Sequence, residues 1–226
     1  MHEIVQRLIR IETQIKEEST KLNLPRISKV IAIAKTFPLE SIMPLIEHGH
    51  LHFGENKVQE AKVKWINIKK EKPGLNLHFV GKLQTNKAKD VVKLFDYVHS
   101  LENSKQAKIL SQYEKKLKRK LKYFIQINIK YEAQKSGIAP MDAKNFLEEC
   151  VSKYDLNIIG LMCLPPNDKS TEKYFEEIKN FKESLLKFHK NQVEELSMGM
   201  SSDYIMAIKY GSTYIRIGTK IFGERK

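Results

Sequence analysis

Lys35 is the residue whose surroundings most favour covalent chemistry. It directly follows the apolar run 30–34 and precedes Thr36, Phe37 and Pro38, so we expect its amine at the end of a buried strand. Desolvation disfavours the charged form of an amine, and a neutral lysine amine can form a Schiff base with a carbonyl compound. A lysine that merely reaches solvent is the alternative, which position alone favours in a chain this rich in lysine.

Residues 197–203 are rich in serine and glycine and indicate an anion site. They lead into a short helical pattern at 203–210, and Ser201 adds a hydroxyl group. Backbone N–H groups at a helix start attract anions such as phosphate. Gly218 and Thr219 follow the last strand pattern and are expected to approach from the neighbouring loop. Ordinary turn chemistry could explain these residues, but both groups occur where barrels often bind phosphate.

Arg216 lies in the last strand pattern, where alternation puts it on the same face as Gly218. An arginine that points into a barrel needs an acceptor. A salt bridge with Glu55 or another carboxylate at a strand end would satisfy it, and a contact with a ring nitrogen of a bound cofactor is the alternative.

Other reactive side chains form no recognisable catalytic pattern. His52, His78 and His99 lack the spacing of metal ligands, and we expect each to be packed or hydrogen-bonded in a structural role. Cys163 has no identifiable histidine partner and is expected in the core. We therefore predict neither a metal site nor a catalytic residue.

The elements that would position these residues alternate along the whole chain. Apolar, β-branched runs predict strands, and seven helical patterns lie between them. The strands are predicted at 29–34, 50–54, 77–81, 97–101, 122–129, 157–163, 193–198 and 213–217. The helices are predicted at 40–48, 57–70, 86–95, 104–120, 141–154, 170–190 and 203–210.

This alternation favours an α/β fold, a (β/α)8 barrel of the TIM type. An eighth helix is missing after the last strand pattern, because only nine residues follow Ile217. Ile4, Leu8, Ile11 and Ile15 recur at helical spacing before the first strand, so an N-terminal helix is expected to complete the outer ring. An open sheet could use the same pattern.

Composition suggests one globular domain over residues 1–226, with 41% hydrophobic and 30% charged residues. The two cysteines form no disulfide framework, the start of the chain has no signal-peptide pattern, and no apolar run approaches the roughly 20 residues of a membrane span. We expect a cytoplasmic protein without a membrane partner.

The formal net charge of +13 could indicate a nucleic-acid surface. The lysines, however, occur throughout the chain, and residues 118–120 are the only tight basic block, without interleaved aromatic residues. We expect lysines spread over solvated helix faces and no nucleic-acid partner, with some electrostatic benefit for anionic small molecules.

Several segments, in order and over nearly the whole chain, resemble the pyridoxal-phosphate homeostasis protein family. The most specific are Ile33-Ala34-Lys35-Thr36, HFGENKVQE at 52–60 and HFVGKLQTNK at 78–87. Further similar segments lie at 126–129, 135–137, 160–162, 196–201 and 211–223.

The resemblance implies a fold-type III barrel, like the N-terminal domain of alanine racemases, with pyridoxal phosphate held as a Schiff base on Lys35. It also implies Asn56 beside the cofactor, Arg216 at the pyridine nitrogen, and the phosphate at Ser201, Gly218 and Thr219. The chain departs from the family at Phe37, where lysine is common, and at Lys82 and Ile205. Lys82 and Lys135 are left as auxiliary cofactor sites.

The leading functional hypothesis is a carrier that buffers pyridoxal phosphate or hands it to apo-enzymes, with no established reaction. An amino-acid racemase is the second, although the chain shows no second acid/base group and an arginine at the ring nitrogen weakens the electron sink. A class I aldolase would also join a Schiff-base lysine to a phosphate site. Because the resembling barrels lack the dimer-forming domain of racemases, we expect a monomer.

Overall fold

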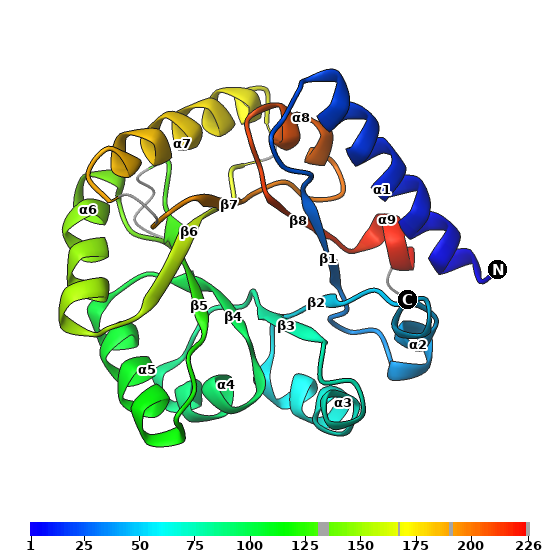
Figure 1. Ribbon diagram of the computed structural model, residues 1–226, viewed down its shortest axis with the longest axis horizontal. Helices are drawn as coiled ribbons and strands as arrows, with labels where there is room; N and C mark the ends of the chain where they lie inside the picture. Colours follow the sequence, from blue (N-terminus) through cyan, green and yellow to red (C-terminus); the bar gives the residue numbers. More distant parts are fainter. Residues whose placement is uncertain (131–135, 167, 190–191, 225–226) are drawn as a thin grey trace.

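The computed structural model describes residues 1–130, 136–166, 168–189 and 192–224. In these residues eight parallel strands follow one another round a closed barrel, and β8 pairs with β1 to complete it (Figure 1). The strands are β1 (Lys29–Ile33), β2 (His52–Glu55), β3 (Asn76–Phe79), β4 (Tyr97–Leu101), β5 (Lys122–Ile127), β6 (Asn157–Cys163), β7 (Glu195–Ser197) and β8 (Tyr214–Ile217). The predicted TIM-type barrel is confirmed.

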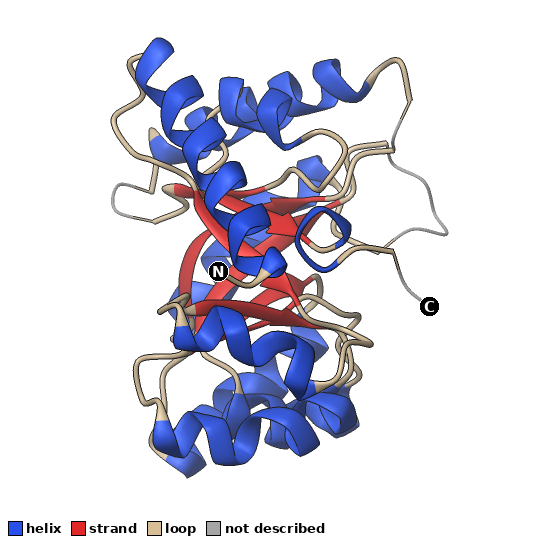
Figure 2. Cartoon of the chain, turned by 90° about the vertical axis from the view of Figure 1, so that its right-hand side faces the viewer, coloured by secondary structure: helices blue, strands red, loops and turns tan. Residues whose placement is uncertain are grey.

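Helices enclose the barrel on its outside, and the loops gather at its two ends (Figure 2). They are α1 (Glu3–Lys21), α2 (Leu39–Glu47), α3 (Val58–Glu71), α4 (Ala88–Leu94), α5 (Ser104–Leu117), α6 (Pro140–Glu148), α7 (Thr171–Leu186), α8 (Tyr204–Lys209) and α9 (Thr219–Phe222). A 3-10 turn (Thr85–Lys87) precedes α4, and a π-helical turn (Glu149–Lys153) continues α6.

The N-terminal helix α1 completes the outer ring, as expected. It buries Leu8, Ile11 and Ile15 and contacts α2, α8 and α9 (Figure 1). The expectation that no helix follows the last strand was wrong, because the short helix α9 lies against α1. Four residues suffice for α9, since its first turn is closed by hydrogen bonds from Ile221 and Phe222 to the Gly218 carbonyl.

Several elements are shorter than their sequence patterns, each for a local backbone reason. β7 begins only at Glu195, because Val193 has a φ of 53°, which a strand cannot contain. α5 ends at Leu117, because Lys118 adopts the left-handed conformation with φ 50°. β2 begins at His52, because the amide of His50 still caps α2 through the Leu45 carbonyl.

The apolar core has an outer and an inner layer. The outer layer lies between strands and helices, and the inner one fills the barrel with Ile31, Ile33, Tyr97, Phe124, Met162 and Tyr214. The barrel also buries polar side chains, among them His78, His99, Ser197 and Arg216. Branched apolar residues usually dominate such interiors, so these polar groups need internal partners.

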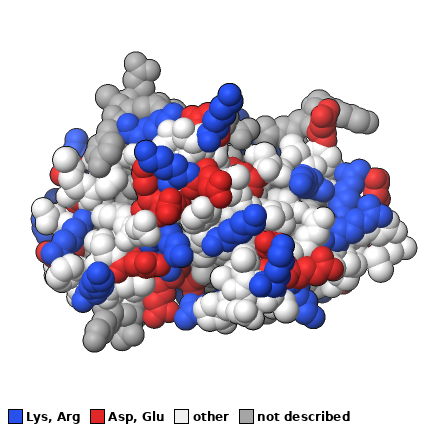
Figure 3. Space-filling model, turned by 90° about the horizontal axis from the view of Figure 1, so that it is seen from above, with Lys and Arg blue, Asp and Glu red and all other residues white. Residues whose placement is uncertain are grey.

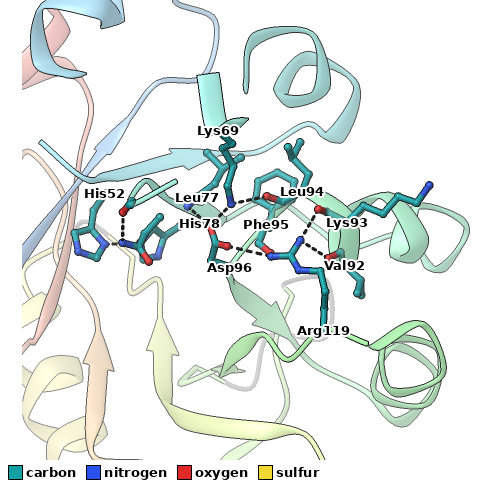
Figure 4. Close-up of polar contacts among 12 residues, drawn as sticks. His52, Lys69, Leu77, His78, Val92, Lys93, Leu94, Phe95, Asp96 and Arg119 are labelled. Atoms are coloured by element: carbon teal, nitrogen blue, oxygen red, sulfur yellow. Dashed lines mark hydrogen bonds and ion pairs between the residues drawn. The ribbon is translucent and has the colours of Figure 1, made fainter. Parts of the chain in front are cut away.

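A polar cluster around Asp96 ties the helices to the start of β4 (Figure 4). The Asp96 carboxylate accepts hydrogen bonds from Lys69, from Arg119 at 3.1 Å and from the Leu77 amide at 2.8 Å. Arg119 also donates to the Val92 carbonyl at 2.8 Å. The Asp96 carboxylate thereby joins α3, β3 and the segment after α5, and Arg119 links this group to α4.

The surface mixes charges of both signs. On the face shown in Figure 3, basic side chains are interspersed with acidic ones. Ion pairs such as Lys62–Asp90 at 3.3 Å and Lys120–Asp155 at 2.6 Å reflect this mixture. Among the described residues, no helix has both the length and the apolar character needed to cross a membrane.

Candidate functional site

A cavity of about 430 Å³ lies where the strands end and the following loops begin. Its lining includes Lys35, Ser201, Arg216, Gly218 and Thr219, which are five of the six residues predicted to contact a cofactor. Apolar side chains form the rest of its walls, namely Ile33, Val80, Met162, Leu164 and Met200, together with Ser202. This volume lies within the range of small-molecule sites.

Asn56, the sixth predicted residue, lines a different hollow of about 590 Å³, together with Glu60, Gly81 and Lys82. Its amide oxygen is buried and has no hydrogen-bond partner among the described residues. The backbone here is tightly packed, because a Cβ built on Gly81 would lie 2.0 Å from the Asn56 carbonyl oxygen.

The predicted auxiliary residue Lys135 lies outside the described residues.

Lys35 lies two residues after the last residue of β1, Ile33, and is half-buried at the mouth of the barrel. The next residue, Thr36, has a φ of 70°, which is unusual for a β-branched side chain. The Thr36 amide donates a hydrogen bond of 2.6 Å to the Glu60 carboxylate at the start of α3. Backbone strain beside a reactive residue persists only where its surroundings enforce it.

Lys64, a buried lysine of α3, holds the same turn from outside the barrel. Its ammonium group donates to the carbonyls of Ala34 at 2.8 Å and Phe37 at 3.0 Å, on either side of Lys35. It also pairs with Glu55 at 2.7 Å and Glu60 at 2.8 Å. We call Glu55, Glu60 and Lys64 the α3 clamp. Sequence reasoning missed it, although Glu60 and Lys64 have the i,i+4 spacing of a helical ion pair.

The predicted phosphate loops after β7 and β8 lie next to each other. The Lys220 amide donates to the Ser201 hydroxyl at 3.4 Å, and the Arg216 amide donates to the Gly199 carbonyl at 3.0 Å. Gly199 has a φ of 90°, and a Cβ on it would lie 2.6 Å from the Ala207 Cβ, so the turn requires glycine. Both loops therefore present their polar groups to one cavity.

Arg216 is buried inside the barrel, as alternation predicted. The alternative of a salt bridge between Arg216 and Glu55 is excluded, because Glu55 points outward to Lys64 and to the Trp65 indole at 3.0 Å. Arg216 instead donates to the Ser197 hydroxyl at 2.6 Å and to the Cys163 carbonyl at 2.9 Å. Burial lowers the pKa of Arg216 to about 10, so its guanidinium stays charged at neutral pH.

The histidines and Cys163 have the structural roles expected of them. Inside the barrel, His52 is hydrogen-bonded to His78, and His78 is hydrogen-bonded to His99. Cys163 is buried in the core, and burial raises the pKa of its thiol to about 12. Among the described residues, no three His, Cys, Asp or Glu side chains are grouped as metal ligands.

The cavity thus combines an amine, a guanidinium group and hydroxyl groups with apolar walls. The amine can condense with a carbonyl compound, and the hydroxyl and backbone groups of the two loops can hold an anion. The apolar side chains suit the faces of a flat ring. A small aromatic aldehyde that carries a phosphate matches this set of groups.

The family model "Alanine racemase, N-terminal domain" matches residues 7–226. The fold is therefore that of an alanine racemase-type barrel. Proteins named "Pyridoxal phosphate homeostasis protein" are 36% identical in Vibrio cholerae, over 100% of this chain and 98% of the relative, and 38% identical in Haemophilus influenzae, over 96% and 92%. The chain belongs to the pyridoxal phosphate homeostasis protein family.

Solved structures agree with this assignment. PipY of Synechococcus elongatus PCC7942, solved with pyridoxal phosphate (PLP) bound, is 33% identical, has a TM-score of 0.85, and aligns over 98% of this chain and 100% of its own. Alanine racemase of Clostridium difficile 630 is 13% identical with a TM-score of 0.71 over 94% of this chain and 57% of its own, which shows a shared fold alone.

Proposed function

We propose that this protein binds pyridoxal phosphate as a Schiff base on Lys35 and acts as a carrier in pyridoxal phosphate homeostasis. The observation that carries the proposal is the single cavity that gathers Lys35, Ser201, Arg216, Gly218 and Thr219. Its relatives are named for this homeostasis, and the related PipY binds the same cofactor. We further propose that the chain works as a single-domain monomer in the cytoplasm.

The residues of the cavity fit the cofactor group by group. Pyridoxal phosphate supplies an electrophilic aldehyde, which the Lys35 amine would hold. The Ser201 hydroxyl and the backbone of Gly218 and Thr219 would bind the phosphate, and Arg216 would donate a hydrogen bond to the ring nitrogen. Asn56, with its unpartnered buried amide oxygen, is proposed as a further contact on the family resemblance.

The chemistry of the cavity favours carriage over turnover. Of the described residues that line the cavity, Lys35 alone carries an amine, and the other polar side chains are hydroxyl groups and the Arg216 guanidinium. Racemisation needs a second acid or base on the opposite face of the substrate. An arginine at the ring nitrogen also leaves that nitrogen unprotonated and weakens the electron sink. An aldehyde held on one lysine is, by contrast, kept from reaction with other amines.

Borohydride reduction followed by peptide mass mapping tests the assignment of Lys35. Reduction of the loaded protein is expected to fix a phosphopyridoxyl group on the peptide that contains Lys35, because borohydride converts a Schiff base into a stable secondary amine. The Lys35→Ala variant is expected to lose that modification and the yellow colour. Lys105→Ala, an exposed lysine of α5, is the matched control and is expected to retain both.

A phosphopyridoxyl group found on another peptide of the native protein would contradict the assignment. The racemase alternative has its own test, a chiral assay of several amino acids with and without added cofactor. Turnover that disappears in Lys35→Ala would favour the racemase over the carrier. A colourless protein that cleaves a sugar phosphate would instead favour the aldolase.

A further inference from the structure

A chain of hydrogen bonds between side chains runs through the barrel to Arg216. His52 Nδ1 lies 2.9 Å from His78 Nε2, a link drawn in Figure 4, and His78 Nδ1 lies 2.9 Å from His99 Nε2. His99 Nδ1 lies 2.8 Å from the Ser197 hydroxyl, to which Arg216 donates at 2.6 Å. We call these five residues the histidine chain.

The histidine chain connects two hollows at opposite ends of the barrel. Arg216 lines the cavity at the carboxyl ends of the strands. His52 lines another hollow of about 470 Å³ beside the start of β1, together with Lys29 and residues of α1 and of the loop before β2. The chain therefore links the proposed ring-nitrogen contact to the far side of the molecule.

Arg216 determines the direction of every hydrogen bond in the chain. A guanidinium group only donates, so the Ser197 oxygen accepts from Arg216. The Ser197 hydrogen is then available to His99 Nδ1. His99 consequently carries its hydrogen on Nε2 and donates to His78, which donates to His52 in the same way. Each ring is then a neutral Nε2–H tautomer.

The opposite direction is disfavoured by the burial of Ser197. In that direction Ser197 would accept from both Arg216 and His99, and its own hydrogen would have to find another acceptor. Ser197 is completely buried, so an unsatisfied hydroxyl hydrogen there would be costly. The favoured direction satisfies the donor and acceptor of each link.

The surroundings of the chain keep its rings neutral and fixed. His78 stacks on Tyr97 with 4.2 Å between ring centroids, and His99 stacks on Phe124 with 4.3 Å. Burial holds the pKa of His78 and of His99 well below the usual value, and the nearby charge of Arg216 adds to this for His99. Arg216 is thus held by Ser197 and the neutral ring of His99, and neither of them neutralises the guanidinium charge.

We propose that Ser197 and His99 are positioning residues that aim Arg216 at the cofactor. The Ser197 oxygen and the Cys163 carbonyl bind Nη1 and Nη2 of Arg216, which leaves its remaining N–H groups for the cavity. This proposal rests on the proposed function, because its target is the ring nitrogen of bound pyridoxal phosphate.

The direction of the chain can be tested on the cofactor-free protein. Nitrogen-15 NMR of the imidazole rings is expected to report His78 and His99 as neutral Nε2–H tautomers between pH 6 and 8. Nδ1–H tautomers or imidazolium rings in this range would overturn the proposed direction. The result does not depend on whether pyridoxal phosphate binds.

The positioning role is tested by Ser197→Ala on the loaded protein. The variant is expected to keep the borohydride-reducible Schiff base on Lys35, to shift the absorption band of the bound cofactor, and to release the cofactor about tenfold faster, the size expected for one hydrogen bond to a charged group. Ser212→Ala is the matched control, because Ser212 is also a buried serine but bonds backbone carbonyls, including Met198 at 2.7 Å. It is expected to leave the absorption band unchanged.

Two substitutions of His99 separate positioning from packing. The amide oxygen introduced by His99→Asn would still offer an acceptor near the Nδ1 position, so this variant is expected to keep the native absorption band. His99→Leu offers no acceptor and is expected to behave like Ser197→Ala. A native band in both Ser197→Ala and His99→Leu, with the Schiff base intact, would overturn the positioning role. Absence of a Schiff base from the unmodified protein would instead contradict the proposed function.

Discussion

At Gly218 the requirements of folding differ most clearly from those of ligand binding. Its φ of −112° is open to any residue, and a Cβ built there would meet Ile33 at 3.6 Å, an ordinary contact. The protein alone therefore accepts a side chain at this position. A side chain at this position would, however, obstruct the bound phosphate, because the proposed phosphate contact uses the Gly218 backbone on the cavity side.

Gly218→Ala is accordingly expected to fold and to bind pyridoxal phosphate poorly. The free energy of unfolding should change by no more than about 1 kcal/mol, as for an ordinary exchange at a helix N-cap. The dissociation constant should rise by about tenfold or more, the cost of losing one hydrogen bond to a charged group. Absorbance titration with pyridoxal phosphate measures it.

Gly74→Ala is the matched control, because a Cβ on Gly74 meets nothing within 4 Å and the residue precedes β3 at the opposite end of the barrel. It should bind the cofactor normally. Equal affinity in Gly218→Ala and Gly74→Ala would place the phosphate elsewhere.

At the scale of elements, helix α3 controls the turn that carries Lys35. The α3 clamp bonds the carbonyls on both sides of Lys35, and Glu60 also holds the Thr36 amide at its strained φ. Burial raises the pKa of Glu55, and the hydrogen bonds from Lys64 and Trp65 act against that rise. Lys64 thus serves both as the counter-ion of a buried carboxylate and as a support for the turn.

Loss of Glu60 is expected to affect cofactor binding more than stability. In Glu60→Ala the Thr36 amide loses its acceptor, and the turn is free to relax away from the geometry that places the Lys35 amine. Schiff-base formation should slow by about tenfold, which corresponds to one hydrogen bond to a charged group. Stopped-flow absorbance with pyridoxal phosphate measures the rate. Glu71→Ala, an exposed residue at the other end of α3, should react at the native rate; a native rate in Glu60→Ala would contradict the role of the clamp.

At the scale of the whole molecule, the histidines inside the barrel make stability depend on pH. Burial lowers the pKa of His52 to about 4 and holds that of His78 and His99 well below the usual value. Below pH 6.5 the unfolded chain therefore binds more protons at these rings than the folded protein does. The contribution of these neutral rings to the free energy of unfolding is therefore fully present above the histidine pKa of the unfolded chain, and it is lost as the pH falls below that pKa.

The expected loss between pH 7.5 and 5.5 is about 3 kcal/mol from His78 and His99 together, since each ring that stays neutral contributes about 1.4 kcal/mol over this interval. Glu55 and Glu114, whose pKa values are raised by burial, act in the opposite sense and offset part of the loss. Urea unfolding at the two pH values measures the difference. His99→Asn should reduce the pH dependence and His48→Gln, an exposed control, should not; equal stability at both pH values would contradict neutral burial.

The sequence by itself determined the order of the elements and the end of the barrel that carries the chemistry. Sequence periodicity alone predicts which face of a strand is buried. It did so for the apolar run before Lys35 and for the alternation at Arg216 and Gly218. The serine-rich segment after β7 was likewise predicted to lie beside the loop after β8, and both loops line the cavity.

Only the tertiary structure decided which atoms meet. Alternation placed Arg216 inside the barrel, yet its partner is Ser197 and not Glu55, because Glu55 faces α3. His99 and Ser197 are 98 residues apart in the chain, and no local pattern connects them. Spacing along a strand sets the face of a side chain, whereas its partner depends on the register of other strands, which closure of the barrel determines.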